Sequence, residues 1–99
     1  MSEVTAAVTP GTLRPRRHVI SARRGGDTVL LDAERDRYFT LNEVGGRVWE
    51  LLVERPRTID QLLLALEHEY DVSRGTLTGD LGRLVDELLA ATLVERSES

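Results

Sequence analysis

The sequence predicts an α+β domain in which three antiparallel strands come first and three helices follow. Apolar and polar residues alternate from Arg17, which is the period of a half-buried strand, and two more short strand-like segments, separated by turn residues, follow up to residue 41. From residue 42 onward, apolar residues recur at intervals of three and four, as on an amphipathic helix. Turn and capping residues separate these segments with almost no spacer between them. Strands followed by three helices in this order predict a winged-helix-like fold.

Composition narrows the class of protein. The 99 residues suit one domain, 40% of them are apolar, and the only four aromatic residues are Tyr38, Phe39, Trp49 and Tyr70. The chain has no cysteine, which excludes disulfides, thiolate nucleophiles and zinc knuckles. No apolar run approaches membrane-spanning length, and no secretory signal core is present. We therefore expect a soluble cytoplasmic protein.

The charge is unevenly distributed along the chain. Residues 1–41 contain seven arginines and five acidic residues, whereas residues 42–99 contain six arginines and twelve acidic residues. Affinity for nucleic acid depends largely on clustered cations, so an acidic helical half repels phosphate. The cluster of arginines over residues 14–24 belongs to the N-terminal part rather than to a recognition helix. A small winged-helix transcriptional regulator is therefore the weaker alternative.

The first part of the chain is predicted as an arm followed by a strand meander. Residues 1–15 have no periodicity and contain two prolines and a glycine, so we expect a disordered arm, with the folded domain at residues 16–95 and a polar tail at 96–99. The first strand starts at Arg17, and the Gly-Gly-Asp sequence that follows it is turn chemistry, because glycine adopts positive φ without steric cost.

Two further strands complete the predicted meander. Residues 28–32 are apolar enough for a second strand, and residues 33–36 form a polar turn. Residues 37–41 are rich in β-branched and aromatic side chains and predict the third strand. In a meander this third strand lies at an edge of the sheet.

The first helix begins after Asn42, whose side chain suits an N-cap. Gly45-Gly46 is costly inside a helix, at about 1 kcal/mol for each glycine relative to alanine, which suggests that a neighbouring backbone approaches closely there. Pro56 ends the helix. Its apolar stripe consists of Val44, Val48, Trp49, Leu51 and Leu52.

Capping signals also begin the second and third helices. Thr58 and Gln61 have the spacing of a capping box, and Ser73 is suited to cap the third helix. The stripe of the second helix consists of Ile59, Leu62, Leu63, Leu66 and Tyr70. The stripe of the third consists of Leu77, Leu81, Leu84, Val85, Leu88 and Leu89.

No group of residues predicts a catalytic or metal site. His18 and His68 lie far apart on different elements and match no metal-ligand spacing. Asp32, Glu34 and Asp36 share one turn but lack a calcium-loop signature, and turns are commonly acidic. We therefore expect a protein that is not an enzyme and that has no cofactor and no metal ion.

The third predicted strand, Arg37–Leu41, is the best candidate for function. An edge strand offers unpaired backbone N–H and C=O groups to an extended peptide. The alternative is an ordinary edge on which Asp36 and Arg37 only discourage aggregation. An oligomerisation module is a further alternative, because an open edge can also pair with its own copy.

Residues 16–95 resemble the PqqD-like family of peptide-binding domains, also called RiPP recognition elements, which serve ribosomally made, post-translationally modified peptides. The most specific matches are Tyr38-Phe39-x-Leu41-Asn42, Gly46-x-Val48-Trp49-x-Leu51-Leu52 and Glu69-Tyr70-Asp71-Val72. Among family members, the chain is most similar to the free-standing leader-binding protein of lasso-peptide biosynthesis. A chaperone for pyrroloquinoline quinone or another modified peptide is the alternative within the family.

The resemblance implies a non-catalytic protein that binds a leader peptide. The leader of a precursor peptide would add as an antiparallel strand to the third strand, under the third helix. The complex would then be presented to a leader peptidase and a lasso cyclase. Carried over to this sequence, the peptide-binding residues are Arg37, Tyr38, Phe39, Thr40, Leu41, Leu77, Asp80, Leu81, Arg83, Leu84 and Glu87.

Overall fold

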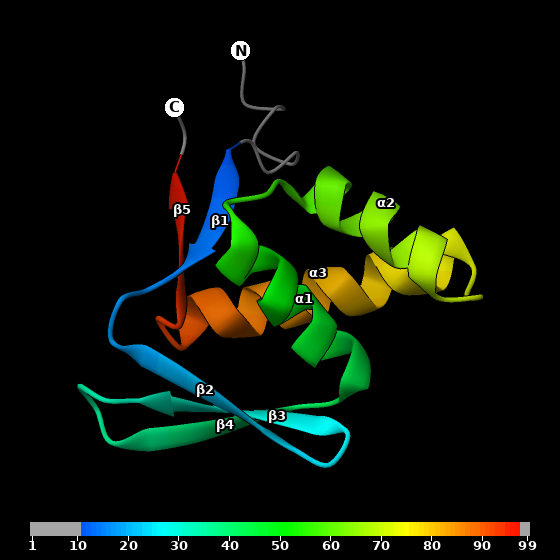
Figure 1. Cartoon of the computed structure of the whole chain (residues 1–99). Coiled ribbons are helices and arrows are strands. Elements are labelled where there is room, and N and C mark those ends of the chain that lie inside the picture. The colour runs from blue at the N-terminus through cyan, green and yellow to red at the C-terminus, as the bar shows by residue number, and fades with distance from the viewer. Residues whose placement is uncertain (1–10, 98–99) are drawn as a thin grey trace.

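A computed structural model describes residues 11–97 of the chain, in which three helices lie next to two small sheets (Figure 1). The larger sheet lies below the helices in that view, and the smaller one lies beside them, near both ends of the chain. In chain order the elements are β1 (Thr12–Pro15), β2 (Val19–Arg24), β3 (Asp27–Asp32), β4 (Arg37–Leu41), α1 (Glu43–Glu54), α2 (Ile59–Glu69), α3 (Arg74–Ala90) and β5 (Val94–Ser97).

The predicted three-stranded meander is confirmed. Its order is β2-β3-β4, all antiparallel, with Leu30 opposite Phe39 and Leu31 opposite Tyr38. The three helices follow in the predicted order, so the α+β class is also confirmed. The likeness to a winged helix stays a prediction. Within this sheet β4 has no partner on its outer side, which leaves it as an edge strand.

The second sheet corrects the predicted arm and tail. Residues 12–15 form β1, which pairs antiparallel with β5, so the prediction of disorder is wrong for that part of the arm. The first two residues of the predicted 96–99 tail belong to β5. Residues 1–10 and 98–99 lie outside the described residues. The strands are only four residues each and pair across the length of the chain, so local periodicity gives little sign of them.

One buried leucine ties β1 to the core. Leu13 is only 1% exposed, and it exchanges two backbone hydrogen bonds with Arg57, at 2.8 and 3.2 Å. Arg14 donates to Glu95 across the strand pair at 2.8 Å. Burial of one leucine contributes about 1.5–3 kcal/mol, enough to hold a short strand that is also hydrogen-bonded on both sides.

The three predicted helix caps are confirmed. The Asn42 side chain accepts a hydrogen bond from the Gly45 N–H at 2.9 Å. Thr58 begins α2 with a complete capping box, in which its N–H donates to the Gln61 side chain. Ser73 accepts from the N–H of Thr76 at 3.2 Å. Because Asn42 directly follows β4, its cap fixes the position of α1 relative to the edge strand.

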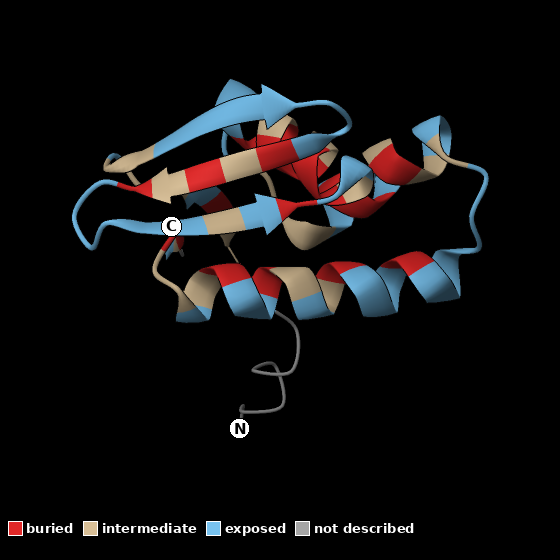
Figure 2. Cartoon of the chain, turned by 90° about the horizontal axis from the view of Figure 1, so that it is seen from below, coloured by how far each residue is buried: buried red, intermediate tan, exposed pale blue. Residues whose placement is uncertain are grey.

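The core lies between the inner face of the larger sheet and the helices. Figure 2 shows the outer face of this sheet, where β2 is almost wholly exposed, and buried positions follow one side of α3. On α3 the buried residues are Leu77, Leu81, Val85 and Leu88, whereas Leu84 and Leu89 are half-buried. The predicted stripe is therefore confirmed, and Leu84 lies at its margin.

The structure explains the glycine at position 46 differently from the prediction of a closely approaching backbone. A Cβ on Gly46 would lie 2.5 Å from Oγ1 of Thr28, a buried residue on β3. The close neighbour is thus a side chain and not a backbone. A Cβ on Gly45 would lie 3.3 Å from Cβ of Leu41. The glycine pair allows α1 to pack directly on β3 and β4.

Replacing Gly46 with alanine is expected to lower the free energy of unfolding by about 1–3 kcal/mol, because Thr28 must move to make room. Gly79 is the matched control, since a Cβ there meets nothing within 4 Å. Gly79→Ala should raise stability by about 0.5–1 kcal/mol through helix propensity alone. Urea denaturation followed by circular dichroism measures both. Equal stability of the two variants would contradict the close packing at Gly46.

The acidic turn between β3 and β4 is a structural feature. Oδ1 of Asp32 accepts hydrogen bonds from the N–H groups of Glu34 and Arg35, each at 3.0 Å. Burial alone would raise the pKa of Asp32, but these donors and the nearby His18 outweigh it, and the pKa lies below its ordinary value. Over residues 11–97, no group of three or more histidine or acidic side chains is arranged to hold a metal ion.

Candidate functional site

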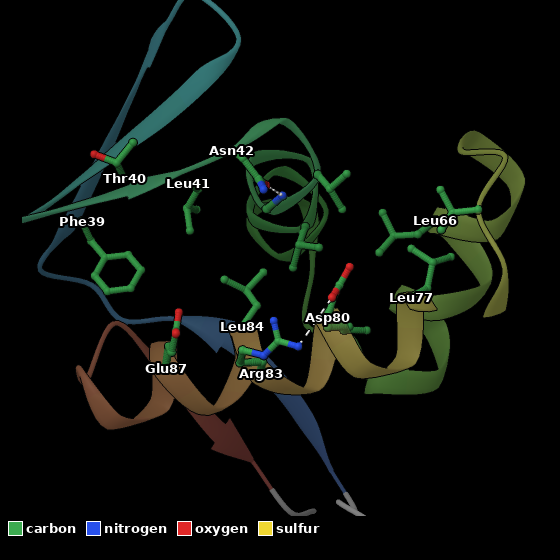
Figure 3. A pocket seen from close by; sticks show the side chains of 15 residues that line it. Phe39, Thr40, Leu41, Asn42, Leu66, Leu77, Asp80, Arg83, Leu84 and Glu87 are labelled. Carbon is green, nitrogen blue, oxygen red and sulfur yellow. Dashed lines mark hydrogen bonds and ion pairs between the residues drawn. The ribbon is translucent and has the colours of Figure 1, made fainter. Parts of the chain in front are cut away.

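A groove with a volume of about 410 Å³ runs between the edge strand β4 and the helix α3 (Figure 3). The start of α1 forms its inner wall, and the end of α2 closes one end. The residues that line it are Phe39, Thr40, Leu41, Asn42, Val44, Gly45, Val48, Leu66, Val72, Leu77, Asp80, Leu81, Arg83, Leu84 and Glu87.

The structure brings nine of the eleven predicted site residues together around this groove. These nine are Phe39, Thr40, Leu41, Leu77, Asp80, Leu81, Arg83, Leu84 and Glu87. The other two, Arg37 and Tyr38, belong to β4 but do not line the groove. Strand alternation explains Tyr38, because successive side chains of a strand point to opposite faces.

Phe39 is the aromatic residue that faces the groove, a question that the sequence left open. It lies opposite the fully buried Leu30 on the inner face of the sheet, and its ring points toward α3 in Figure 3. Tyr38 lies opposite Leu31 and is 72% exposed. An aromatic side chain is thus available at the groove, next to the open backbone edge of β4.

Six groove residues were not predicted as part of the site. The sequence assigns most of them a structural role, either as a helix cap or as members of the apolar stripes of α1 and α2. Val72 gave the one available signal in the sequence, because it is a large apolar residue between Asp71 and Ser73. The six are Asn42, Val44, Gly45, Val48, Leu66 and Val72.

The groove combines an apolar floor with a charged rim on α3. Its floor includes Val48 and Leu81, both buried, and its rim carries Asp80, Arg83 and Glu87. A concave apolar surface with a few polar groups at its margin is typical of a ligand site. Running beside an open strand edge, it can accept an extended chain whose side chains alternate between the groove and solvent.

An ion pair links α1 to the end of α2. The guanidinium of Arg47 on α1 donates two hydrogen bonds to the carboxylate of Glu69 on α2, at 2.8 and 2.9 Å. The hydrogen bond from Arg47 lowers the pKa of Glu69, and the same contact raises the pKa of Arg47. Glu69 is the last residue of α2, and Leu66, nearly one turn earlier on the same helix, lines the groove.

Comparisons with known proteins agree with this geometry. The family model described as coenzyme PQQ synthesis protein D (PqqD) matches residues 27–94, which include β3, β4 and all three helices. A search of curated proteins gave no significant match.

Within residues 11–97, no helix is both long enough and apolar enough to cross a bilayer.

Two solved structures share the fold. One is described as TbiB1 in complex with the TbiA(beta) leader peptide; it is 31% identical, with a TM-score of 0.76, over 87% of this chain and 99% of that one. The other is described as lasso peptide synthetase B1 complexed with the leader peptide, at 24% identity and a TM-score of 0.72, over 84% of this chain and 96% of that one.

The fold and the groove thus define a small domain of the PqqD type. The chain belongs to the PqqD family, since the family model covers more than half of it and the alignment with a relative at 31% identity covers 87% of it. The resemblance to PqqD-like RiPP recognition elements is confirmed.

Proposed function

We propose that the protein binds the leader segment of a ribosomal precursor peptide by strand addition to β4. The observation that carries the proposal is the apolar groove of about 410 Å³ that follows this open strand edge. The leader-peptide complexes of the two structural relatives support it. The leader lies antiparallel to β4, with alternate side chains directed into the groove and covered by α3.

The expected affinity follows from these contacts. A strand of five residues such as β4 offers a few outward backbone groups, and each hydrogen bond contributes about 1 kcal/mol net. One buried aromatic or aliphatic anchor adds about 2–3 kcal/mol. After the cost of ordering a flexible peptide, we expect a Kd between about micromolar and nanomolar. Pockets for side chains supply the specificity, because every peptide has the same backbone.

The role of the protein in its pathway is presentation and not catalysis. A leader held along β4 leaves the rest of the precursor free to enter an enzyme. We propose that the complex delivers the precursor to a leader peptidase and then to a lasso cyclase. Because precursors of this kind are made on ribosomes, we place this step in the cytoplasm.

Fluorescence anisotropy tests the binding step. The labelled TbiA(beta) leader peptide and the leader of any precursor whose gene is found next to that of this chain serve as probes, and scrambled peptides serve as controls. We expect saturable binding of at least one leader and none of its scrambled form. Mass spectrometry of the same mixtures should show an unchanged peptide. Absence of binding to both leaders at about 100 µM, or cleavage without an added peptidase, contradicts the proposal.

The description of the matching family model favours a second candidate within the same class, a chaperone of a precursor for pyrroloquinoline quinone or another modified peptide. The two candidates share the groove and differ in the leader that it accepts. Competition separates them: a leader from such a pathway that displaces the lasso leader at lower concentration favours the second candidate.

A further inference from the structure

On the rim of the groove, one charged side chain has no partner among the described residues 11–97. Asp80, Arg83 and Glu87 are the only charged residues among those that line the groove, and their spacing places them on one side of α3. Arg83 and Asp80 form an ion pair at 3.7 Å. The side chain of Glu87 makes no hydrogen bond and no ion pair with any residue of the described range 11–97. The groove therefore presents a net negative charge at Glu87.

This charge lies at a defined end of the groove. Figure 3 shows Glu87 and Phe39 at the same end, with Leu84 between them and the centre of the groove. Leu66 and Leu77 lie at the other end. The end near Phe39 thus combines an aromatic ring, an aliphatic side chain and a free carboxylate, whereas the opposite end is apolar.

We propose that Glu87 is a specificity-determining residue that selects a lysine or arginine in the bound peptide. This inference rests on the proposed function, since it names the class of leader that the groove accepts. The aliphatic part of a lysine or arginine packs on Phe39 and Leu84, and its charged group reaches Glu87. Such a side chain matches both the apolar surface and the carboxylate at this end of the groove. An apolar side chain leaves the carboxylate without a partner, and an acidic side chain is repelled by it.

The position of the cation in the peptide follows from the direction of the strand. A peptide antiparallel to β4 has its N-terminal part near Leu41 and its C-terminal part near Phe39. The basic residue therefore lies C-terminal to the apolar residues that fill the end near Leu66 and Leu77.

Selection from a displayed library of random peptides of about a dozen residues tests the proposal without a known leader. The immobilised targets are the parent, Glu87→Lys and Asp86→Lys. Asp86 is exposed, adjacent and outside the groove lining, so its variant makes the same charge change next to the site. Circular dichroism checks that each protein is folded.

Peptides selected on the parent and on Asp86→Lys should share lysine or arginine at one position, C-terminal to apolar residues. Selection on Glu87→Lys should place aspartate or glutamate there and keep the apolar positions. The same peptides from all three targets, with no charge preference, would overturn the role of Glu87 and leave leader binding intact. If no peptides are enriched on any target, the proposed function fails, and the inference fails with it.

A charge swap measures the effect. For one selected peptide, Glu87→Lys should weaken binding by about tenfold, and replacing its basic residue with glutamate should restore most of the loss. Glu87→Gln should give an intermediate loss. Additive effects of the protein and peptide changes, with no restoration, would overturn the direct pairing.

Discussion

Replacement of Trp49 by alanine is expected to lower the free energy of unfolding by about 3–5 kcal/mol, the largest stability effect of any single change considered for this protein. Trp49 is only 2% exposed and is the largest side chain on the buried face of α1. A domain of this size has a total stability of about 5–15 kcal/mol, so the loss is a large fraction of the total and should lower the urea midpoint markedly.

Two variants of α1 serve as controls for Trp49→Ala. Trp49→Phe keeps an aromatic ring and removes an indole N–H that is buried and has no hydrogen-bond partner among residues 11–97, so it should cost less than half as much. Val53 is 61% exposed, and Val53→Ala should change stability by less than about 0.5 kcal/mol. Circular dichroism in urea measures all three. If Trp49→Ala unfolds at the same urea concentration as Val53→Ala, the packing of α1 is not as described.

Replacement of Phe39 by alanine is expected to raise the Kd for a leader peptide by about 10- to 100-fold, which corresponds to about 1.5–3 kcal/mol of lost apolar contact. Phe39 is half-buried and faces the groove from β4. Part of the ring packs against the core, so a modest loss of stability accompanies the loss of binding. Anisotropy titration at a temperature well below the melting transition separates the two effects.

Tyr38→Ala is the matched control for Phe39→Ala. It removes an aromatic ring from the adjacent residue of the same strand, but this ring is on the other face of the sheet and does not line the groove. It should leave the Kd within about twofold of the parent. A greater loss of binding from Tyr38→Ala than from Phe39→Ala would mean that the peptide lies on the outer face of the sheet.

Local signals in the sequence predict most of the fold. The bounds of β4 follow from five residues of strand-forming type between a polar turn and Asn42, and the structure gives the same bounds. The caps at Asn42, Thr58 and Ser73 were predictable because each depends on residues only three positions apart. The meander and the buried stripe of α3 follow from periodicity for the same reason.

Features that depend on distant residues were not predictable. The pairing of β1 with β5 joins residues about eighty positions apart, and its buried residues are Leu13 on β1 and Val94 on β5. The contact of Gly46 with the side chain of Thr28 depends on the exact position of α1 on the sheet. The helix glycines indicated close packing there but not its partner.

The candidate site was predictable in outline only. The open edge of β4 follows from its place at the end of a meander, and the remaining site residues came from resemblance to a family. Resemblance did not give the face to which Phe39 points, because alternation fixes two opposite faces without saying which one α3 covers. Leu66 and Val72 reach the groove from the end of α2 and the linker after it, and only the tertiary structure brings them there.

Amide hydrogen exchange, measured by NMR on the isotope-labelled protein with and without a bound leader peptide, tests strand addition to β4 most directly. Alternate amides of an edge strand point away from the sheet, so binding should slow the exchange of every second amide within Arg37–Leu41. Strand β2 is the other edge of the same sheet and is the internal control, with unchanged exchange over Val19–Arg24. Saturating leader that leaves the amides of β4 unprotected, or that protects β2 instead, would contradict the account.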